Sequence, residues 1–319
     1  MSTKIQWTDE TWNILVGCSR VPGSPGCQNC YAAEAAKSPR LQQFEQYQKV
    51  RSWNGTVEFV ESQLIKPLKW KKPKRIFVCS MSDIFHKNVE TAWIDKIFAV
   101  MAIASQHSFQ VLTKRPERML QYLSDNQTPD RIEEAGYEFS HNMEFDWPLP
   151  NVWIGTSVEN QEMADKRIPY LLQTPAKIRF LSCEPLLGPL DLGNHLVCEY
   201  CQGNGRQLKV IHWHKGGVAG YVDCPQCGNN LWNNKINWVI VGGESGHNAR
   251  PCRVEWIKSI VTQCQDAHIA SFVKQLGAKP YLGCEDYLPG INTINLRDRK
   301  GGNPDEWPDE LKIQQFPSI

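Results

Sequence analysis

Short runs of apolar residues recur along the chain, and each run is followed by polar residues. Four to six apolar or small residues without strict alternation are typical of strands that are buried on both faces of a parallel sheet. A further strand predicted near residues 11–15 would bring the total to about seven. The six longer runs are RIFVCSMSD (75–83), FQVLTKRP (109–116), NVWIGTSVEN (151–160), KIRFLSCEP (177–185), WVIVGGESG (238–246) and ASFVKQLG (270–277).

Helical patterns lie between these strands. Apolar residues at spacings of three and four mark one buried face of a helix, and they occur in segments 94–101 and 254–264. Alternating strands and helices imply a parallel α/β architecture with right-handed crossovers. We therefore expect a full or partial (β/α) barrel, with an open doubly wound sheet as the competing architecture. The apolar positions are Ile94, Ile97, Phe98 and Met101, and Val254, Ile257, Val261 and Cys264.

Two internal segments do not follow the alternating pattern. Residues 125–150 are polar and are expected to form a loop. Residues 194–236 are expected to form a zinc-ribbon insertion between two strands, on the cysteines described below. The barrel-like catalytic domain would then comprise residues 1–193 and 237–297.

The C-terminal segment, residues 298–319, is unusually well specified for a chain end. Trp307 is a large apolar anchor, and the glycines and prolines around it favour a compact turn. We expect the segment to fold back toward the active face, either as a cap that covers the barrel or as a lid over the substrate.

The composition is that of an ordinary globular protein, with 41% hydrophobic and 22% charged residues. The formal net charge is +1, so any nucleic-acid site would have to be a local patch. No apolar run approaches the roughly 20 residues of a membrane span. The polar start MSTKIQWTDE lacks the form of a signal peptide. We therefore expect a soluble, cytoplasmic protein without a membrane partner.

Twelve cysteines are many for a protein of the reducing cytoplasm, where disulfides are rare. Seven of them form two spaced groups, and grouped cysteines in such surroundings indicate metal ligands. The other five are expected to be small buried hydrophobic residues. The first group is Cys18, Cys27 and Cys30, the second is Cys198, Cys201, Cys224 and Cys227, and the single cysteines are Cys79, Cys183, Cys252, Cys264 and Cys284.

The first group, Cys18-x8-Cys27-x2-Cys30, follows the first predicted strand. Three thiolates can hold three irons of a 4Fe–4S cluster and leave the fourth iron open. Radical enzymes use such an iron to bind S-adenosylmethionine and to split it by transfer of one electron. A three-cysteine zinc site completed by a distant His or Cys is the alternative. Chemistry is expected at the carboxyl end of a barrel strand, which favours the cluster.

The second group, Cys198-x2-Cys201-x22-Cys224-x2-Cys227, indicates a zinc ribbon. A tetrahedral zinc held by four thiolates is the expected site, and it would stabilise an insertion too small to have its own core. A redox pair or a second iron–sulfur cluster is the alternative. The ribbon could contact nucleic acid or be purely structural.

Polar side chains gather at the predicted carboxyl ends of the strands, where residues of a β/α barrel do chemistry. Helix N-caps explain the serines equally well, but they explain the carboxylates and Lys114 less well. Two adjacent glycines would let a ligand approach the backbone closely. The candidate catalytic residues are Lys114, Glu159, Glu184 and Glu244. The candidate cofactor-binding residues are Tyr31, Ser80, Asp83, Ser157, Glu159, Glu184, Gly242 and Gly243.

Seven ordered blocks of the sequence resemble a phage- and prophage-associated family of unknown function that is regarded as radical-SAM-like through its three cysteines. The resemblance runs from about residue 3 to residue 317 and implies a barrel of the radical-SAM type. The common radical-SAM motif is Cys-x3-Cys-x2-Cys with an aromatic residue before the last cysteine, whereas here Asn29 precedes Cys30 and Tyr31 follows it. The blocks are KIQWTDETWNILVGC, SMSDIFH, LTKRPERM, NVWIGTSVENQ, RFLSCEPLLGPL, WVIVGGESGHNARP and KGGNPDEWPDELK.

Radical-SAM proteins often carry a Gly-Gly-Glu motif after the second strand that holds the amino group of S-adenosylmethionine. Here the sequence GGES at 242–245 follows a late strand. Glu244 is therefore a candidate for holding substrate, while Glu159 and Glu184 are rival acceptors of the amino group.

The leading hypothesis is a radical-SAM-like iron–sulfur enzyme with a 4Fe–4S cluster and zinc, which cleaves S-adenosylmethionine reductively and abstracts hydrogen from a substrate. It implies an electron donor such as a flavodoxin or a ferredoxin, and the phage association suggests a nucleotide or nucleic acid as substrate. One alternative is a non-catalytic, zinc-containing nucleic-acid-binding protein. The other is a divalent-metal-dependent hydrolase with Asp83, Glu159, Glu184 and Glu244 around the ion.

Overall fold

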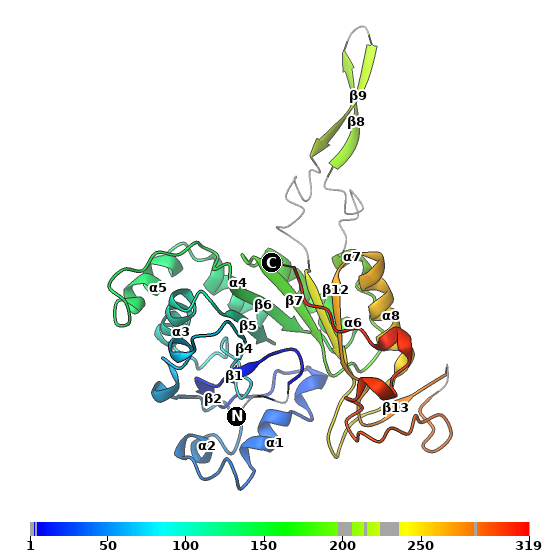
Figure 1. Ribbon diagram of the computed structural model, residues 1–319, viewed down its shortest axis with the longest axis horizontal. Coiled ribbons are helices and arrows are strands. Elements are labelled where there is room, and N and C mark those ends of the chain that lie inside the picture. The colour runs from blue at the N-terminus through cyan, green and yellow to red at the C-terminus, as the bar shows by residue number, and fades with distance from the viewer. Residues whose placement is uncertain are drawn as a thin grey trace.

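The computed structural model describes residues 3, 5–196, 206–213, 216–223, 236–283 and 286–318 (Figure 1). Its main element is a 7-stranded parallel sheet, which confirms the strands that the sequence predicts. The strands are β1 (Glu10–Trp12), β4 (Arg75–Val78), β5 (Ser108–Thr113), β6 (Val152–Ser157), β7 (Ile178–Cys183), β10 (Trp238–Gly242) and β12 (Ala270–Gln275).

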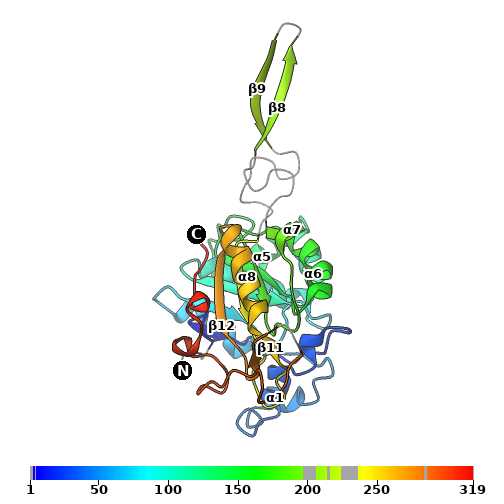
Figure 2. The ribbon, with the colours of Figure 1, turned by 90° about the vertical axis from the view of Figure 1, so that its right-hand side faces the viewer.

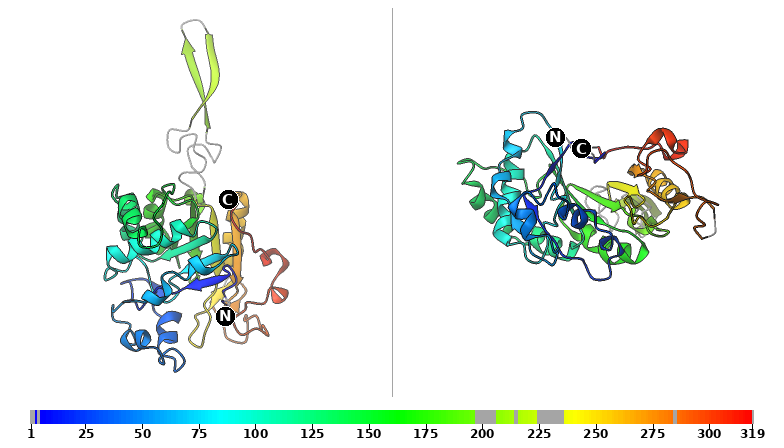
Figure 3. Two further views of the ribbon diagram at one scale, coloured as in Figure 1. Left: turned by 60° about the vertical axis from the view of Figure 1, so that its left-hand side comes forward. Right: turned by 90° about the horizontal axis from the view of Figure 1, so that it is seen from below.

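The order of the strands in the sheet, β1-β4-β5-β6-β7-β10-β12, is the same as their order in the chain. A doubly wound sheet reverses its strand order at a switch point, so the observed order excludes that alternative. The sheet is strongly curled, and among the described residues its outer strands β1 and β12 do not pair with each other (Figure 3). The fold is therefore an α/β half-barrel, which is the partial form of the predicted barrel.

Helices cover the convex face of the curled sheet (Figure 1, Figure 3). Two of them confirm the helices predicted at 94–101 and 254–264. The prediction of a loop over residues 125–150 is wrong in part, because a helix begins at Thr128 with Pro129 in its first turn and with Ile132 buried. The main helices are α3 (Thr91–Ile103), α4 (Pro116–Ser124), α5 (Thr128–Gly136), α6 (Gln161–Gln173) and α8 (Val254–Asp266).

Shorter elements connect the strands and helices. They are the helices α1 (Tyr31–Ala36), α2 (Glu45–Lys49) and α7 (Gly193–Leu196), the paired strands β2 (Leu15–Val16) and β3 (Glu58–Phe59), the paired strands β11 (Cys252–Arg253) and β13 (Pro280–Tyr281), and the 3-10 turns η1 (Pro25–Cys27), η2 (Glu61–Gln63), η3 (Pro67–Lys69), η4 (Pro304–Glu306) and η5 (Asp309–Leu311). Within the part of the chain that the structure describes, every helix lacks the length and apolar character of a membrane-spanning segment.

The predicted insertion, residues 194–236, contains an antiparallel hairpin of β8 (Arg206–Trp213) and β9 (Gly216–Asp223). The four cysteines of the predicted zinc ribbon, Cys198, Cys201, Cys224 and Cys227, lie outside the described residues. The zinc site therefore stays a prediction from the sequence.

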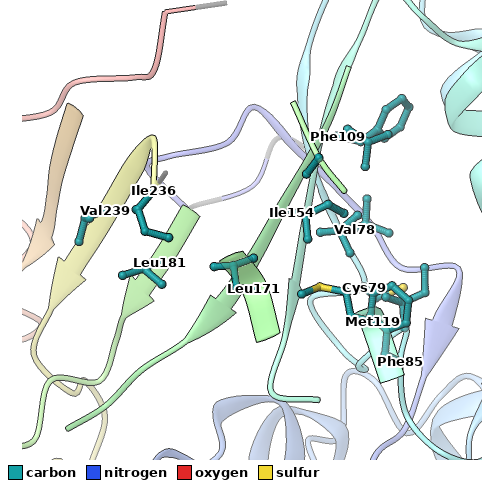
Figure 4. Close-up of a cluster of buried hydrophobic side chains, with 14 of the residues drawn as sticks. Val78, Cys79, Phe85, Phe109, Met119, Ile154, Leu171, Leu181, Ile236 and Val239 are labelled. Carbon is teal, nitrogen blue, oxygen red and sulfur yellow. The ribbon is translucent and has the colours of Figure 1, made fainter. Parts of the chain in front are cut away.

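The two faces of the sheet carry different side chains, because successive residues of a strand point to opposite faces. The outer face packs against the helices in one large apolar cluster, which includes Val78, Phe109, Ile154, Leu181 and Val239 (Figure 4). The inner face carries a second cluster that is mostly aromatic. Its aromatic members are Trp7, Phe77, Trp153, Phe180, Trp238 and Phe272, and Phe316 packs against them.

The inner-facing positions change from aromatic to polar toward the carboxyl ends of the strands. Steps of two residues lead from Trp153 to Ser157, from Phe180 to Ser182, from Trp238 to Gly242 and from Phe272 to Lys274. Glu159 and Glu244 lie two residues beyond the ends of β6 and β10, and Glu184 lies directly after β7. The half-barrel thus has an aromatic interior near the amino ends of its strands and a polar edge at their carboxyl ends.

The C-terminal segment runs along β12, the last strand of the sheet. Gln314 forms an antiparallel bridge with Phe272, and the Val273 amide donates to the carbonyl of Ile313 over 2.8 Å. Trp307 is buried, and its indole N–H donates to a backbone carbonyl over 2.9 Å. An uncovered edge strand invites pairing with other chains. The contacts of the segment are therefore those expected of a cap.

Replacing Trp307 with alanine should weaken this cap. Removal of a large buried aromatic side chain typically lowers the free energy of unfolding by about 3–5 kcal/mol, and urea denaturation followed by circular dichroism would measure the change. Leu282→Ala is the matched control, because Leu282 is 48% exposed. Its replacement should change the free energy of unfolding by less than about 0.5 kcal/mol. Equal stability of the Trp307 variant and the wild type would contradict the assignment of the segment as a cap.

Candidate functional site

The cysteine loop, residues 17–30, starts beside the carboxyl end of β4. Gly17 forms a parallel bridge with Ser82, and its amide donates to the carbonyl of Met81 over 3.0 Å. The Ser82 hydroxyl donates to the carbonyl of Gly17 over 2.6 Å. The helix that follows the loop, α1, lies at the same end of the molecule as β11, which follows β10 (Figure 2). The loop therefore sits at the polar edge of the half-barrel.

The three cysteines of the loop are partly exposed, whereas the four described cysteines elsewhere are buried. All of these thiols are free. Burial of Cys79, Cys183, Cys252 and Cys264 confirms the prediction that single cysteines serve as small hydrophobic residues, while Cys284 lies outside the described residues. Within the described ranges, no three His, Cys, Asp or Glu side chains form a ready-made metal site.

Arg115 ties the start of the cysteine loop to Asp83. Its Nη1 lies 2.8 Å from Oδ2 of Asp83 and 3.7 Å from Sγ of Cys18, and its Nη2 donates to the carbonyl of Ser19 over 2.9 Å. Asp83 also accepts from the hydroxyl of Thr113 over 2.7 Å. Burial raises the pKa of the Cys18 thiol to about 12, and Asp83 adds to that rise while Arg115 opposes it. The carboxylate of Asp83 is thus used to hold the chain around the loop.

Glu159 lies completely buried under the cysteine loop. Its carboxylate is 3.0 Å from Nζ of Lys114 and 2.9 Å from Nη1 of Arg167. Ser24 of the loop donates to it over 3.3 Å, and a Cβ atom on Gly26 would come within 2.3 Å of Oε1. Burial alone would raise the pKa of Glu159, but the two cations outweigh burial, so the pKa is lowered. Glu159 is therefore negatively charged, and the two cations offset its charge. Gly26 leaves the space that the Glu159 carboxylate occupies beneath the loop.

Glu244 holds the other end of the loop. The amide of Asn29 donates to Oε2 of Glu244 over 3.2 Å. The guanidinium of Arg250 grips the same carboxylate through Nε at 2.8 Å and Nη2 at 2.6 Å, and it also donates to Gln28 over 3.1 Å. Burial raises the pKa of Glu244, but the hydrogen bonds from Arg250 and Asn29 outweigh burial and lower it. The loop is therefore anchored at the ends of both β5 and β10.

Tyr31 and Ser80 connect the loop to the first two strands of the sheet. The Tyr31 hydroxyl donates to the carbonyl of Ser80 over 2.7 Å, and the Ser80 hydroxyl donates to Asn13 over 2.9 Å. Ser157 is buried, and its carbonyl accepts from Arg167 over 2.7 Å. These predicted cofactor-binding residues all contact other parts of the protein that surround the loop.

Gly242 and Gly243 lie against the end of β12. A Cβ atom on Gly243 would come within 2.3 Å of the carbonyl oxygen of Leu276, and one on Gly242 would be 3.0 Å from that of Gln275. The neighbour that needs this space is the backbone of the protein itself. This packing is one reason for glycine at both positions, and the approach of a ligand to their backbone stays a prediction from the sequence.

Glu184 and Lys274 form an ion pair at the same edge. Glu184 directly follows β7 and Lys274 lies on β12, so the two side chains meet across the end of β10. Their side chains are 16% and 22% exposed. All four candidate catalytic residues are thus charged groups with a charged partner at the carboxyl edge.

Sequence reasoning missed several polar residues that hold the predicted ones. His86 is buried, with Nε2 2.8 Å from the hydroxyl of Ser19 and Nδ1 accepting from the backbone. The sequence held a signal for His86 and Arg250, because they lie inside the quoted blocks SMSDIFH and WVIVGGESGHNARP. Arg167 lies eight residues after Glu159, on the helix α6 that follows it. Asn29 had no signal besides its place beside Cys30.

The stability of the protein should fall as the pH drops from 6.5 toward 4, because His86 is buried as a neutral side chain. Burial lowers the pKa of His86 from 6.5 to about 4, and the charge of Arg115 adds to this effect. Between these values the unfolded chain binds a proton that the folded chain does not, so stability is complete above pH 6.5 and is lost on acidification. At pH 5 the loss should be about 2 kcal/mol.

Urea denaturation at neutral pH and at pH 5 would measure this loss. His86→Asn is the comparison, because its side chain does not titrate. Its stability should be lower than that of the wild type at neutral pH, but it should fall by about 2 kcal/mol less on acidification. An equal fall in both proteins would mean that His86 is not buried in its neutral form.

The family comparison covers nearly the whole chain. Residues 2–297 match a family described as a protein of unknown function (DUF5131), and this range includes the cysteine loop and every strand of the sheet. No curated protein and no solved structure shows a detectable match to the chain. The chain therefore belongs to the DUF5131 family of proteins of unknown function.

Proposed function

We propose that this protein is a radical-SAM-like iron–sulfur enzyme whose reaction takes place at the carboxyl edge of the half-barrel. The proposal rests on the position of the cysteine loop. Side chains from the ends of β5, β6 and β10 hold a loop with three partly exposed cysteine residues at the polar edge of the sheet. Catalytic groups of β/α barrels lie at this edge, and the sequence blocks that resemble a radical-SAM-like family support the same reaction.

The donor set of the loop fits a 4Fe–4S cluster. Cys18, Cys27 and Cys30 would hold three irons, and the fourth would stay open to the amino and carboxylate groups of S-adenosylmethionine. When bound, the cluster would supply the one electron that breaks the C5′–S bond, which releases methionine and a 5′-deoxyadenosyl radical that takes a hydrogen atom from the substrate. Binding would have to draw the three sulfur atoms together, since they form no ready-made site among the described residues.

Arg115 would offset the negative charge of the thiolates. Its guanidinium stays charged at every accessible pH and already lies 3.7 Å from Sγ of Cys18. A thiolate is unfavourable at this buried position unless a cation is near, as the raised pKa of Cys18 indicates. Asp83 fixes the guanidinium through its 2.8 Å contact. Both are positioning residues in this proposal.

The ion pairs of the site favour this proposal over a divalent-metal hydrolase. A divalent cation needs several carboxylates that converge on one point. Here each carboxylate is held by a different cationic side chain, which competes with a metal ion for the carboxylate oxygens. The pairs are Asp83 with Arg115, Glu159 with Lys114 and Arg167, Glu184 with Lys274, and Glu244 with Arg250.

Three further parts of the proposal rest on the sequence. A zinc ion held by the four cysteines of the insertion would stabilise that segment. A flavodoxin or a ferredoxin would supply the electron. A nucleotide or nucleic acid would be the substrate, by analogy with the phage-associated family.

The iron content of the protein should depend on the cysteine loop, and its zinc content should depend on the insertion. Cys27→Ala should reduce the iron content of anaerobically purified protein from about four atoms per chain to nearly none, while about one zinc remains. Cys224→Ala should have the reverse effect. Elemental analysis and visible absorption would measure both metals.

Cys264→Ala is the matched control, because this cysteine is buried in the core away from the loop, and it should retain both metals. A colourless wild-type protein without iron after anaerobic purification and reconstitution would contradict the proposal. Loss of both metals in either variant would mean that the two sites are not independent.

The reconstituted protein should cleave S-adenosylmethionine when dithionite supplies electrons. The expected products are methionine and 5′-deoxyadenosine, measured by liquid chromatography and mass spectrometry, and Cys18→Ala should produce neither. Lys258→Gln should match the wild type, since the Lys258 side chain is 56% exposed on the surface. A protein that holds its cluster and leaves S-adenosylmethionine intact would refute the assigned reaction.

A further inference from the structure

The Glu184–Lys274 pair differs from the other ion pairs at the carboxyl edge in how open its carboxylate is. The Glu184 side chain is 16% exposed, whereas those of Asp83, Glu244 and Glu159 are 9%, 6% and 0% exposed, and the Lys274 side chain is 22% exposed. The residue between them at the end of β10 is Gly242, which has no side chain to separate them. The pair therefore offers both a negative and a positive group at a partly open position.

Both members of the pair keep unused hydrogen-bonding capacity. A carboxylate can accept about four hydrogen bonds, and an ammonium group can donate three. In the part of the chain that the structure describes, the side chains of Glu184 and Lys274 bind only each other. The carboxylates of Glu159 and Glu244 instead interact with Lys114, Arg167 and Ser24, and with Arg250 and Asn29, respectively. The open pair is thus the least saturated charged group at the edge.

We infer that this pair binds the α-amino and α-carboxylate groups of an amino-acid moiety. The amino group would donate to Glu184, and the carboxylate would accept from Lys274, so one ion pair is exchanged for two. A ligand with a single charge would leave one partner unpaired in a partly buried position, which is unfavourable. The matching ligand class is therefore a zwitterion.

Two sources could supply this moiety. One is the methionyl part of S-adenosylmethionine, in which case the inference rests on the proposed function. The other is an amino-acid substrate, in which case it does not. S-adenosylhomocysteine carries the zwitterion, and 5′-methylthioadenosine carries the same nucleoside without it, so these two ligands isolate the contribution of the zwitterion.

Isothermal titration calorimetry of the full chain would test the inference with three variants. Glu184→Gln/Lys274→Gln should bind S-adenosylhomocysteine at least tenfold more weakly than the wild type, because hydrogen bonds to charged groups are lost. Its affinity for 5′-methylthioadenosine should stay within twofold. Glu184→Gln alone, which leaves Lys274 in place, should also bind S-adenosylhomocysteine more weakly than the wild type. This single variant keeps the test valid if the double variant does not fold. Lys258→Gln/Glu310→Gln removes a surface pair that is 56% and 52% exposed, and it should bind both ligands like the wild type.

Weaker binding of S-adenosylhomocysteine alone would support the cofactor as the source. If its affinity does not change, the twenty amino acids are tested by thermal shift, and stabilisation of the wild type but not of Glu184→Gln would support an amino-acid substrate. Unchanged affinity without such stabilisation, or a wild type that binds none of these probes, would overturn the inference. The proposed function fails separately, through a lack of iron or of reductive cleavage, which the binding measurements do not require.

Discussion

Glu159 carries its negative charge where solvent is excluded, directly under Gly26 of the cysteine loop. Removing such a charge from water is unfavourable by several kcal/mol, and only close partners offset this. The partners come from two other elements, Lys114 at the end of β5 and Arg167 in α6, and Ser24 adds a hydrogen bond from the loop itself. Strand, helix and loop must all be in place before the charge is compensated. The position of the loop is therefore coupled to the packing of the barrel wall.

The curl of the sheet is what allows one loop to reach so many strands. The loop begins beside β1 and β4, yet Asn29 contacts Glu244 after β10, five strands away from β1 in the sheet. In a flat sheet that separation would be about 24 Å. The loop also contacts residues at the ends of β5 and β6 on the way. A concave sheet brings these ends around a common centre, and the alternation of side chains makes its inner face polar there.

Much of this arrangement could be predicted from the sequence, because it depends on local patterns. Apolar runs followed by polar residues locate the strands and place Lys114, Glu159 and Glu184 at one edge. The spacing of Cys18, Cys27 and Cys30 marks them as candidate metal ligands. The contact between Asn29 and Glu244 could not be predicted, since the two residues are 215 positions apart and nothing local relates them. Gly243 shows the same limit, because its need for space comes from the end of β12.

The insertion joins the barrel at the end opposite to the cysteine loop. Leu196, near the start of the insertion, and Ile236, its last residue, are both buried in the outer core. The amide of Asn237 then donates to the carbonyl of Arg179, near the start of β7, over 2.8 Å. Because both ends of the insertion are fixed to the barrel, the segment between them can change without moving the barrel. The length and content of the insertion can thus diverge during evolution, or be exchanged for another module, while the residues that hold the cysteine loop keep their positions.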